Sequence, residues 1–160
     1  MDEKTLFLKF WEREAPAIRK VISRIPQERS SYKPEPKSRN AREIVWLLVN
    51  EERFLVEGLE NGKIDWREIP APEKVQDILA AYDRQHEDLT ARLRRIDHEL
   101  WEKQIPFLYE GQEYKQESGY DFAWEFLFDL VHHRGQLTTY LRPMGSTVPS
   151  IYGPSADEPV

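Results

Sequence analysis

The sequence contains no cysteine, which excludes disulfides, thiolate nucleophiles and zinc–thiolate sites together. No apolar run in it approaches the roughly 18 residues that a membrane-spanning helix needs. The N-terminal stretch MDEKTLFLKFWERE carries acidic residues where a secretion signal would be basic. These absences predict a cytoplasmic protein that neither spans a membrane nor is exported across one.

Basic residues are outnumbered, with 23 Lys and Arg against 29 Asp and Glu, which gives a net charge of -6. The densest basic cluster, ARLRRI at residues 91–96, lies between acidic neighbours and is typical of a solvated helix face. No basic stripe is present that would follow a phosphate backbone, so a nucleic-acid partner is not expected.

Several familiar catalytic signatures are also missing. The sequence has no HExxH motif, no glycine loop of the kind that cradles phosphate, and no nucleophile elbow. Its loop serines have no base fixed beside them, so a Ser-His-Asp triad is not indicated.

The 160 residues are enough for one domain, and four segments show the helical period. We expect helices at about 5–25, with a kink or a break at Pro16, and at about 40–59, 72–103 and 120–142. The segment 104–120 is a mixed connection, in which a short hairpin is left open. The predicted fold is an all-α four-helix bundle over residues 1–143, with residues 144–160 as a tail packed on it or extending from it.

Ionisable residues occupy apolar helix faces at a few positions. Glu51 lies at the centre of the apolar arc of the second helix, whereas Glu52 is expected to point outward. In the fourth helix, Asp129 and His133 are four residues apart and fall in the middle of the apolar face. In the third helix, His86 interrupts a long apolar stripe.

Buried carboxylates need a partner, because an unpaired one costs several kcal/mol. One alternative is a network in which protonated His133 lies between Asp129 and Glu51, with Gln136 or Tyr140 adding hydrogen bonds. The other is a divalent metal, such as Zn²⁺, Ni²⁺, Mn²⁺ or Fe²⁺, held by Glu51, Asp129 and His133.

Two further histidines have a weaker claim on such a site. His86 is more typical of a hydrogen-bonded core residue than of a further ligand. His132 falls to the side of the inward face of the fourth helix.

Three segments resemble the DinB-like (DinB/YfiT) family of metal-binding four-helix bundles. The most specific is HHRGQLTTYLRPMGSTVPSIYGPSAD, and the others are PKSRNAREIVWLLVNEERFLVEGL and FLKFWEREAPAIRKVISRIP. The resemblance implies an up-down-down-up bundle, frequent dimers and three metal-binding histidines. By position, His133 matches the last of these, Asp129 replaces the preceding one, and Leu47 replaces the histidine of the second helix. Glu51, one turn beyond Leu47, is the nearby group that can stand in as a ligand.

The resemblance also implies a function, because characterised members are similar to thiol-dependent S-transferases, in which a metal activates a low-molecular-weight thiol. We therefore predict a homodimeric, metal-dependent thiol transferase or hydrolase with an altered metal site. The alternative is a non-catalytic bundle that has lost the metal and acts as a binding or dimeric scaffold. Leu47 favours this alternative, since leucine cannot ligate a metal.

Overall fold

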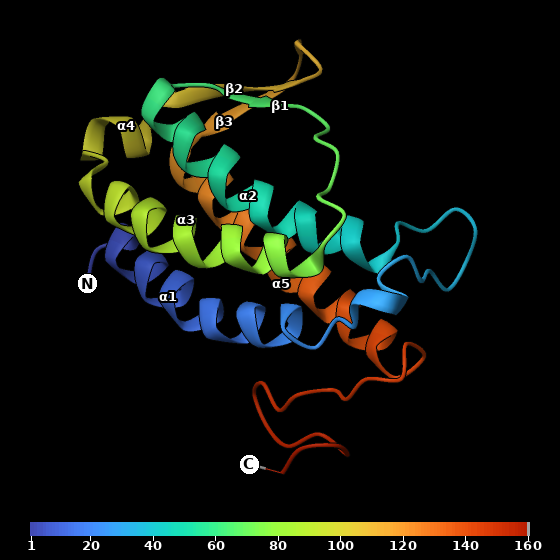
Figure 1. The fold of residues 1–160 in the computed structure, drawn as a ribbon. Coiled ribbons are helices and arrows are strands. Elements are labelled where there is room, and N and C mark those ends of the chain that lie inside the picture. The colour runs from blue at the N-terminus through green and yellow to red at the C-terminus, as the bar shows by residue number, and fades with distance from the viewer. Residues whose placement is uncertain (160) are drawn as a thin grey trace.

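The protein is described by a computed structural model covering residues 1–159, in which helices dominate (Figure 1). The long helices are α1 (Glu3–Ile22), α2 (Ala41–Asn61), α3 (Val75–Arg95) and α5 (Gly119–Leu141). A short helix, α4 (His98–Glu102), and a 3₁₀ turn, η1 (Gln27–Arg29), lie in the connections. The strands are β1 (Ile64–Trp66), β2 (Gln104–Tyr109) and β3 (Gln112–Ser118).

The four long helices pack around one apolar core. In Figure 1, α1 and α5 run in one direction, and α2 and α3 run in the opposite direction. Contacts between helix ends agree, since Lys4 Nζ donates to the Arg94 carbonyl at 2.9 Å and thereby joins the start of α1 to the end of α3. The largest fully buried side chains come from all four helices and β1, and include Trp11, Ile18, Ile22, Ile44, Leu48, Leu55, Leu59, Ile64, Ile78, Tyr82 and Phe122.

The bounds of α2 follow from its local sequence. The Asn40 side chain accepts from the Glu43 amide, and the Glu43 carboxylate accepts from the Asn40 amide, which makes a capping box at the start. At the other end, Gly62 takes the left-handed conformation with a φ of 69°, which glycine adopts without steric cost. These caps fix α2, which carries Glu51, close to its predicted range.

Two predicted helices differ from those in the structure. The third was expected to reach residue 103, but it ends at Arg95, because Ile96 has a ψ of 122° and Asp97 caps the separate helix α4. The first was expected to break or kink at Pro16. The helix α1 is not broken there, since it continues through Pro16, and it ends at Ile22 rather than near residue 25.

The prediction of an all-α fold is wrong in one respect, because the chain also forms a three-stranded sheet. β1 pairs in parallel with β2, and β2 pairs antiparallel with β3. The hairpin left open for residues 104–120 therefore exists. Its tight turn places Glu110 at a φ of 49° and Gly111 at 81°, as two-residue hairpin loops require.

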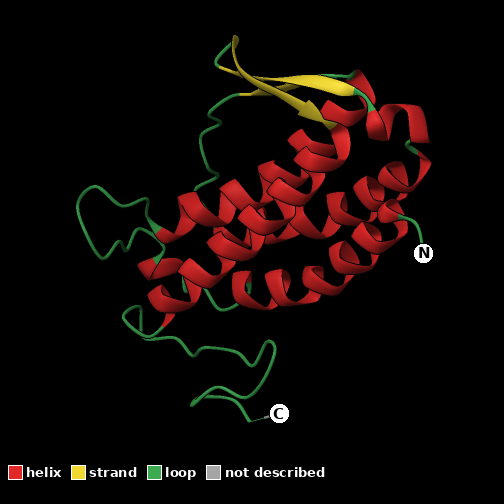
Figure 2. Cartoon of the chain, turned by 180° about the vertical axis from the view of Figure 1, so that it is seen from behind, coloured by secondary structure: helices red, strands yellow, loops and turns green. Residues whose placement is uncertain are grey.

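The sheet packs at one end of the bundle, as both ribbon views show (Figures 1 and 2). Gly58 permits this close approach of β1 to α2, since a Cβ there would lie 3.1 Å from the Ile64 Cα and would clash with its side chain. Through this contact, a three-residue strand is held beside the helix that carries Glu51.

The segment 144–159 lies at the opposite end of the bundle from the sheet and returns along α1 (Figures 1 and 2). Tyr152 Oη donates to a Glu14 carboxylate oxygen at 2.5 Å, and Glu158 forms an ion pair with Lys20 at 2.7 Å. Arg134 of α5 pairs with Glu14 of α1, and its guanidinium also donates to Tyr152 Oη at 2.6 Å. Arg134 thus holds α5, α1 and the C-terminal segment together.

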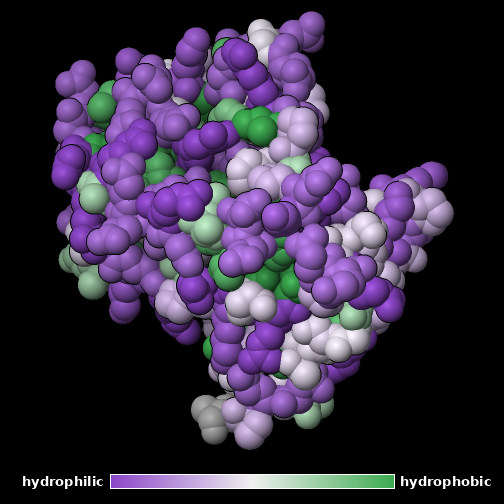
Figure 3. All heavy atoms as spheres, viewed as in Figure 1, coloured by the Kyte–Doolittle hydropathy of each residue, from purple (hydrophilic) through white to green (hydrophobic). Residues whose placement is uncertain are grey.

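Hydrophilic residues cover most of the face seen in Figure 3, and hydrophobic residues show between them. None of the helices within residues 1–159 is long and apolar enough to cross a bilayer.

Candidate metal site and its pocket

Glu51 lies on the face of α2 that packs against α5, where its side chain is only 2% exposed. Its Oε2 atom is buried and has no hydrogen-bond partner among the described residues. An unpartnered buried carboxylate oxygen is uncommon in folded proteins and points to a missing ligand or ion.

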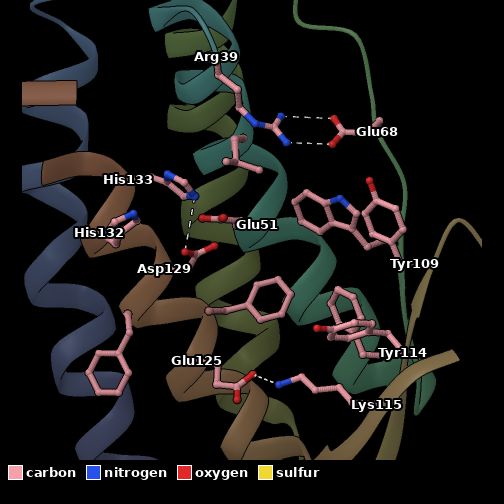
Figure 4. Close-up of a pocket in the computed structure, with 15 residues that line it drawn as sticks. Arg39, Glu51, Glu68, Tyr109, Tyr114, Lys115, Glu125, Asp129, His132 and His133 are labelled. Carbon is pink, nitrogen blue, oxygen red and sulfur yellow. Dashed lines mark hydrogen bonds and ion pairs between the residues drawn. The ribbon is translucent and has the colours of Figure 1, made fainter. Parts of the chain in front are cut away.

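Asp129 and His133 approach Glu51 from α5, one helical turn apart (Figure 4). His133 Nε2 lies 3.5 Å from Asp129 Oδ1, and one donor atom from each of Glu51, Asp129 and His133 lies within 4.8 Å of the others. The structure therefore brings together the three side chains singled out from the sequence.

Gln136 orients the imidazole, since its Oε1 lies 2.9 Å from His133 Nδ1. An amide oxygen can only accept, so Nδ1 carries the proton in this bond. In the neutral imidazole, Nε2 then keeps its lone pair and faces Asp129. Metal-binding histidines commonly have such a partner on the other ring nitrogen.

The three groups perturb one another electrostatically. Burial, reinforced by the neighbouring Asp129, raises the pKa of Glu51 well above its ordinary value. When His133 is protonated, its Nε2 donates to Asp129, and this hydrogen bond lowers the pKa of Asp129, although partial burial opposes the shift. Burial lowers the pKa of His133, but its hydrogen bonds with Asp129 and Gln136 outweigh that effect and raise the pKa overall. Without a cation, the site therefore favours a proton on Glu51 and a charge on Asp129.

The donor set fits a divalent cation. Two carboxylates and an imidazole are ligands that Zn²⁺, Mn²⁺, Fe²⁺ and Ni²⁺ accept. Tetrahedral donors bound to an ion at about 2.1 Å are separated by about 3.4 Å. The donor atoms of this cluster lie within 4.8 Å of one another, and the side chain of Asp129, which is 54% exposed, has room to move closer.

That exposure corrects one expectation. The helical wheel placed Asp129 in the middle of a buried face, but the residue lies at the wall of a solvent-accessible pocket. The pocket opens between α2, α5 and the sheet, so this part of α5 has no helix over it. Only Glu51 of the three is fully buried.

A second correction concerns Glu52, which was expected to point outward. Its side chain is 1% exposed and accepts from His86 Nδ1 of α3 at 2.9 Å. His86 stacks between Trp11 and Tyr82, with ring centroids at 5.7 and 5.4 Å. His86 is therefore a hydrogen-bonded core residue, and the three-residue cluster does not include it.

The pocket has a volume of about 730 Å³, within the range of small-molecule sites. Glu51, Asp129, His132 and His133 line one side, and Leu47 lies beside them. His132 thus lines the pocket without joining the cluster.

The remaining lining residues are Arg39, Trp66, Glu68, Phe107, Tyr109, Tyr114, Lys115, Glu125, Phe126 and Phe128. Sequence reasoning did not place them at the site, and half of them lie on the three strands. The signal that could have found some of them is the Glu-Gly turn at residues 110 and 111, flanked by aromatic residues on both strands.

Comparison with known proteins identifies the class of protein to which this helical fold with a pocket belongs. The profile of the DinB family matches residues 1–159, so the chain belongs to the DinB family. It is also 32% identical over 157 residues to the uncharacterized protein YrdA of Bacillus subtilis (strain 168), covering 95% of this chain and 89% of that protein.

Solved structures share the fold. A DinB-like protein from Bacillus cereus ATCC 10987 superposes with a TM-score of 0.76 at 20% identity, over 91% of this chain and 95% of that one. The DinB-like protein YjoA from Bacillus subtilis gives 0.71 at 18% identity, over 89% and 94%. The mycothiol-dependent maleylpyruvate isomerase gives 0.55 at 13% identity, over 84% of this chain and 60% of that one.

Proposed function

We propose that this protein is a metal-dependent enzyme in which Glu51, Asp129 and His133 hold a divalent cation and a low-molecular-weight thiol is the substrate. The reaction class is thiol transfer or a related hydrolysis. The observation that carries the proposal is the convergence of three donors at a pocket wall, one of them a buried carboxylate oxygen without a partner.

Each of the three residues has a distinct part in this proposal. Glu51 supplies a ligand from the bundle interior, where its position is fixed by burial. His133 presents Nε2 because Gln136 engages Nδ1, and half-exposed Asp129 adjusts to complete the set. When bound, a divalent cation supplies Lewis acidity, which favours ionisation of a thiol at neutral pH.

Two comparisons support the thiol as substrate class. The DinB family is the family of this chain, and a structural neighbour, the maleylpyruvate isomerase, depends on the thiol mycothiol. We also propose that the four long helices follow the up-down-down-up order of the family. In Figure 1, α1 runs parallel to α5, and α2 runs parallel to α3, which supports this order. We also propose that the protein is a homodimer and that it is cytoplasmic. Sedimentation of the purified protein tests whether it is a dimer.

Metal titration of untagged protein tests the proposal. We expect about one equivalent of Zn²⁺, Ni²⁺ or Mn²⁺ to bind by calorimetry, and the Glu51→Gln variant to bind at least about tenfold more weakly, as loss of a charged ligand predicts. Glu57→Gln, on the same helix but outside the cluster, is the matched control and should bind like the wild type. Less than about a tenth of an equivalent, with no heat of binding, would reject the metal site.

The alternative function, a bundle that acts without metal as a binding or dimeric scaffold, is favoured by Leu47. This leucine lines the pocket where the family resemblance implies a histidine. A Leu47→His variant discriminates between the two, because an imidazole there adds a fourth donor beside Glu51. Metal binding that appears only in this variant would favour the scaffold. Tight metal binding by the unmodified protein would leave no reason to propose the scaffold.

A further inference from the structure

The pocket has a second half that the proposed metal chemistry does not use. Opposite the metal ligands lies an aromatic wall, defined by Trp66, Phe107, Tyr109, Tyr114 and Phe126. Figure 4 shows Tyr109 and Tyr114 across the pocket from Glu51, Asp129 and His133. The wall is built from all three strands and from α5, so the sheet gives the pocket this surface.

Four of the five rings of the wall, all but that of Tyr109, form a connected set rather than isolated contacts. Phe107 lies 6.3 Å from Phe126 and 6.4 Å from Tyr114 between ring centroids, and Trp66 lies 6.4 Å from Phe126. Tilted and edge-on arrangements at these distances are favourable between aromatic rings. They also leave ring faces and edges for a further planar group.

The burial of the wall changes from its base to its rim. Phe126 is 8% exposed at the base, whereas Tyr109 is 48% and Tyr114 is 77% exposed at the rim. Large exposed aromatics that gather at one hollow, rather than scatter singly, mark a binding surface. The core does not need these two tyrosine rings.

The charges around the pocket are balanced by internal pairs. Arg39 pairs with Glu68 at 3.0 Å, and Lys115 pairs with Glu117 at 3.1 Å and also with Glu125. These are the two lining residues with permanent positive charge among residues 1–159, and both are engaged. In the metal-free protein, an anionic ligand would therefore find no unpaired lysine or arginine in the pocket, and it would meet the carboxylate of Asp129.

We infer that the aromatic wall is a subsite for an uncharged, planar ring compound, the second reactant in the reaction at the metal site. This inference rests on the proposed function for the role of the compound, although binding of the ring depends on the wall alone. The pocket volume suits a molecule of one or two fused rings beside a small thiol, and it is too small for a folded partner.

A pair of fluorescent probes tests the inference in the full chain, freed of metal with a chelator. N-phenyl-1-naphthylamine is an uncharged aromatic compound whose emission rises in apolar surroundings. 8-Anilinonaphthalene-1-sulfonate has the same rings and one negative charge. We expect the uncharged probe to saturate at one equivalent per chain and the sulfonate to bind at least about tenfold more weakly.

A double variant, Tyr109→Ala with Tyr114→Ala, removes the rim without touching the core. It should weaken the uncharged probe at least about tenfold, while Tyr120→Ala, a partly exposed tyrosine outside this pocket, should leave the affinity unchanged. Unchanged affinity in the double variant, equal affinity for both probes, or no saturable binding would overturn the inference. A further result would also overturn the inference. If the wild type is a dimer that binds no probe, and the double variant is a monomer, then a second copy of the chain covers the aromatic wall.

Metal titration of the same double variant separates this inference from the proposed function, since the three ligands remain in place. Loss of probe binding in the variant with normal metal binding supports the ring subsite. Probe binding by a wild-type protein that takes up no metal would contradict the proposed function and leave the ring site standing.

Discussion

Glu51 and Glu52 are neighbours in the chain but face different helices. Consecutive residues of a helix point about 100° apart, so one glutamate meets α5 and the other meets α3. The sequence pattern showed the inward position of Glu51, because apolar residues flank it on both sides. It misplaced Glu52, since a wheel for one helix cannot show that α2 is covered by two neighbours.

At this scale, the raised pKa of Glu51 predicts a pH effect on stability. Because burial raises the folded-state pKa above that of the unfolded chain, the metal-free protein loses stability as the pH rises from about 4.5 toward the raised value. Glu51→Gln keeps the shape without the charge, so it should be more stable than the wild type at neutral pH and about equally stable below pH 4. Urea unfolding of metal-free protein across this range is the measurement, and a variant less stable at pH 7 would contradict it.

The elements differ in how far the sequence could predict them. The long helices carry about 20 residues of apolar period with caps such as Asn40, so their signal is strong and local. The strands are three to seven residues long, and β1 pairs with a partner about 40 residues away. Pairing over that distance leaves no local trace, so β1 and its part of the aromatic wall could not be placed, whereas the turn at residues 110 and 111 is a local signal for the hairpin.

The pair of α2 and α3 yields a prediction from the Glu52–His86 contact. His86→Ala removes the partner of a fully buried carboxylate, which commonly costs around 3 kcal/mol of unfolding free energy. His98→Ala, at an exposed histidine of α4, is the control and should cost little. Metal affinity should stay unchanged, because the pair lies outside the metal cluster. A loss in His86→Ala no larger than that of the control would show that Glu52 is satisfied in another way.

At the scale of the whole molecule, the pocket results from segments far apart in the chain. Its walls come from Arg39 before α2, from α2 itself, from β1 and the segment after it, from the hairpin and from α5. The DinB resemblance indicated the family, which is confirmed, and a mostly helical fold, which solved structures of DinB-like proteins share. The pocket and the exposure of Asp129 depend on how the sheet packs at the end of the bundle, which no single helix pattern contains.

Anomalous scattering from crystals soaked in Zn²⁺ tests the central claim most directly. We predict a single strong peak within bonding distance of carboxylate oxygens of Glu51 and Asp129 and of His133 Nε2, with Gln136 still bonded to Nδ1. A soaked crystal with no peak there, or with zinc held by other residues while Glu51 stays unbound, would contradict the account.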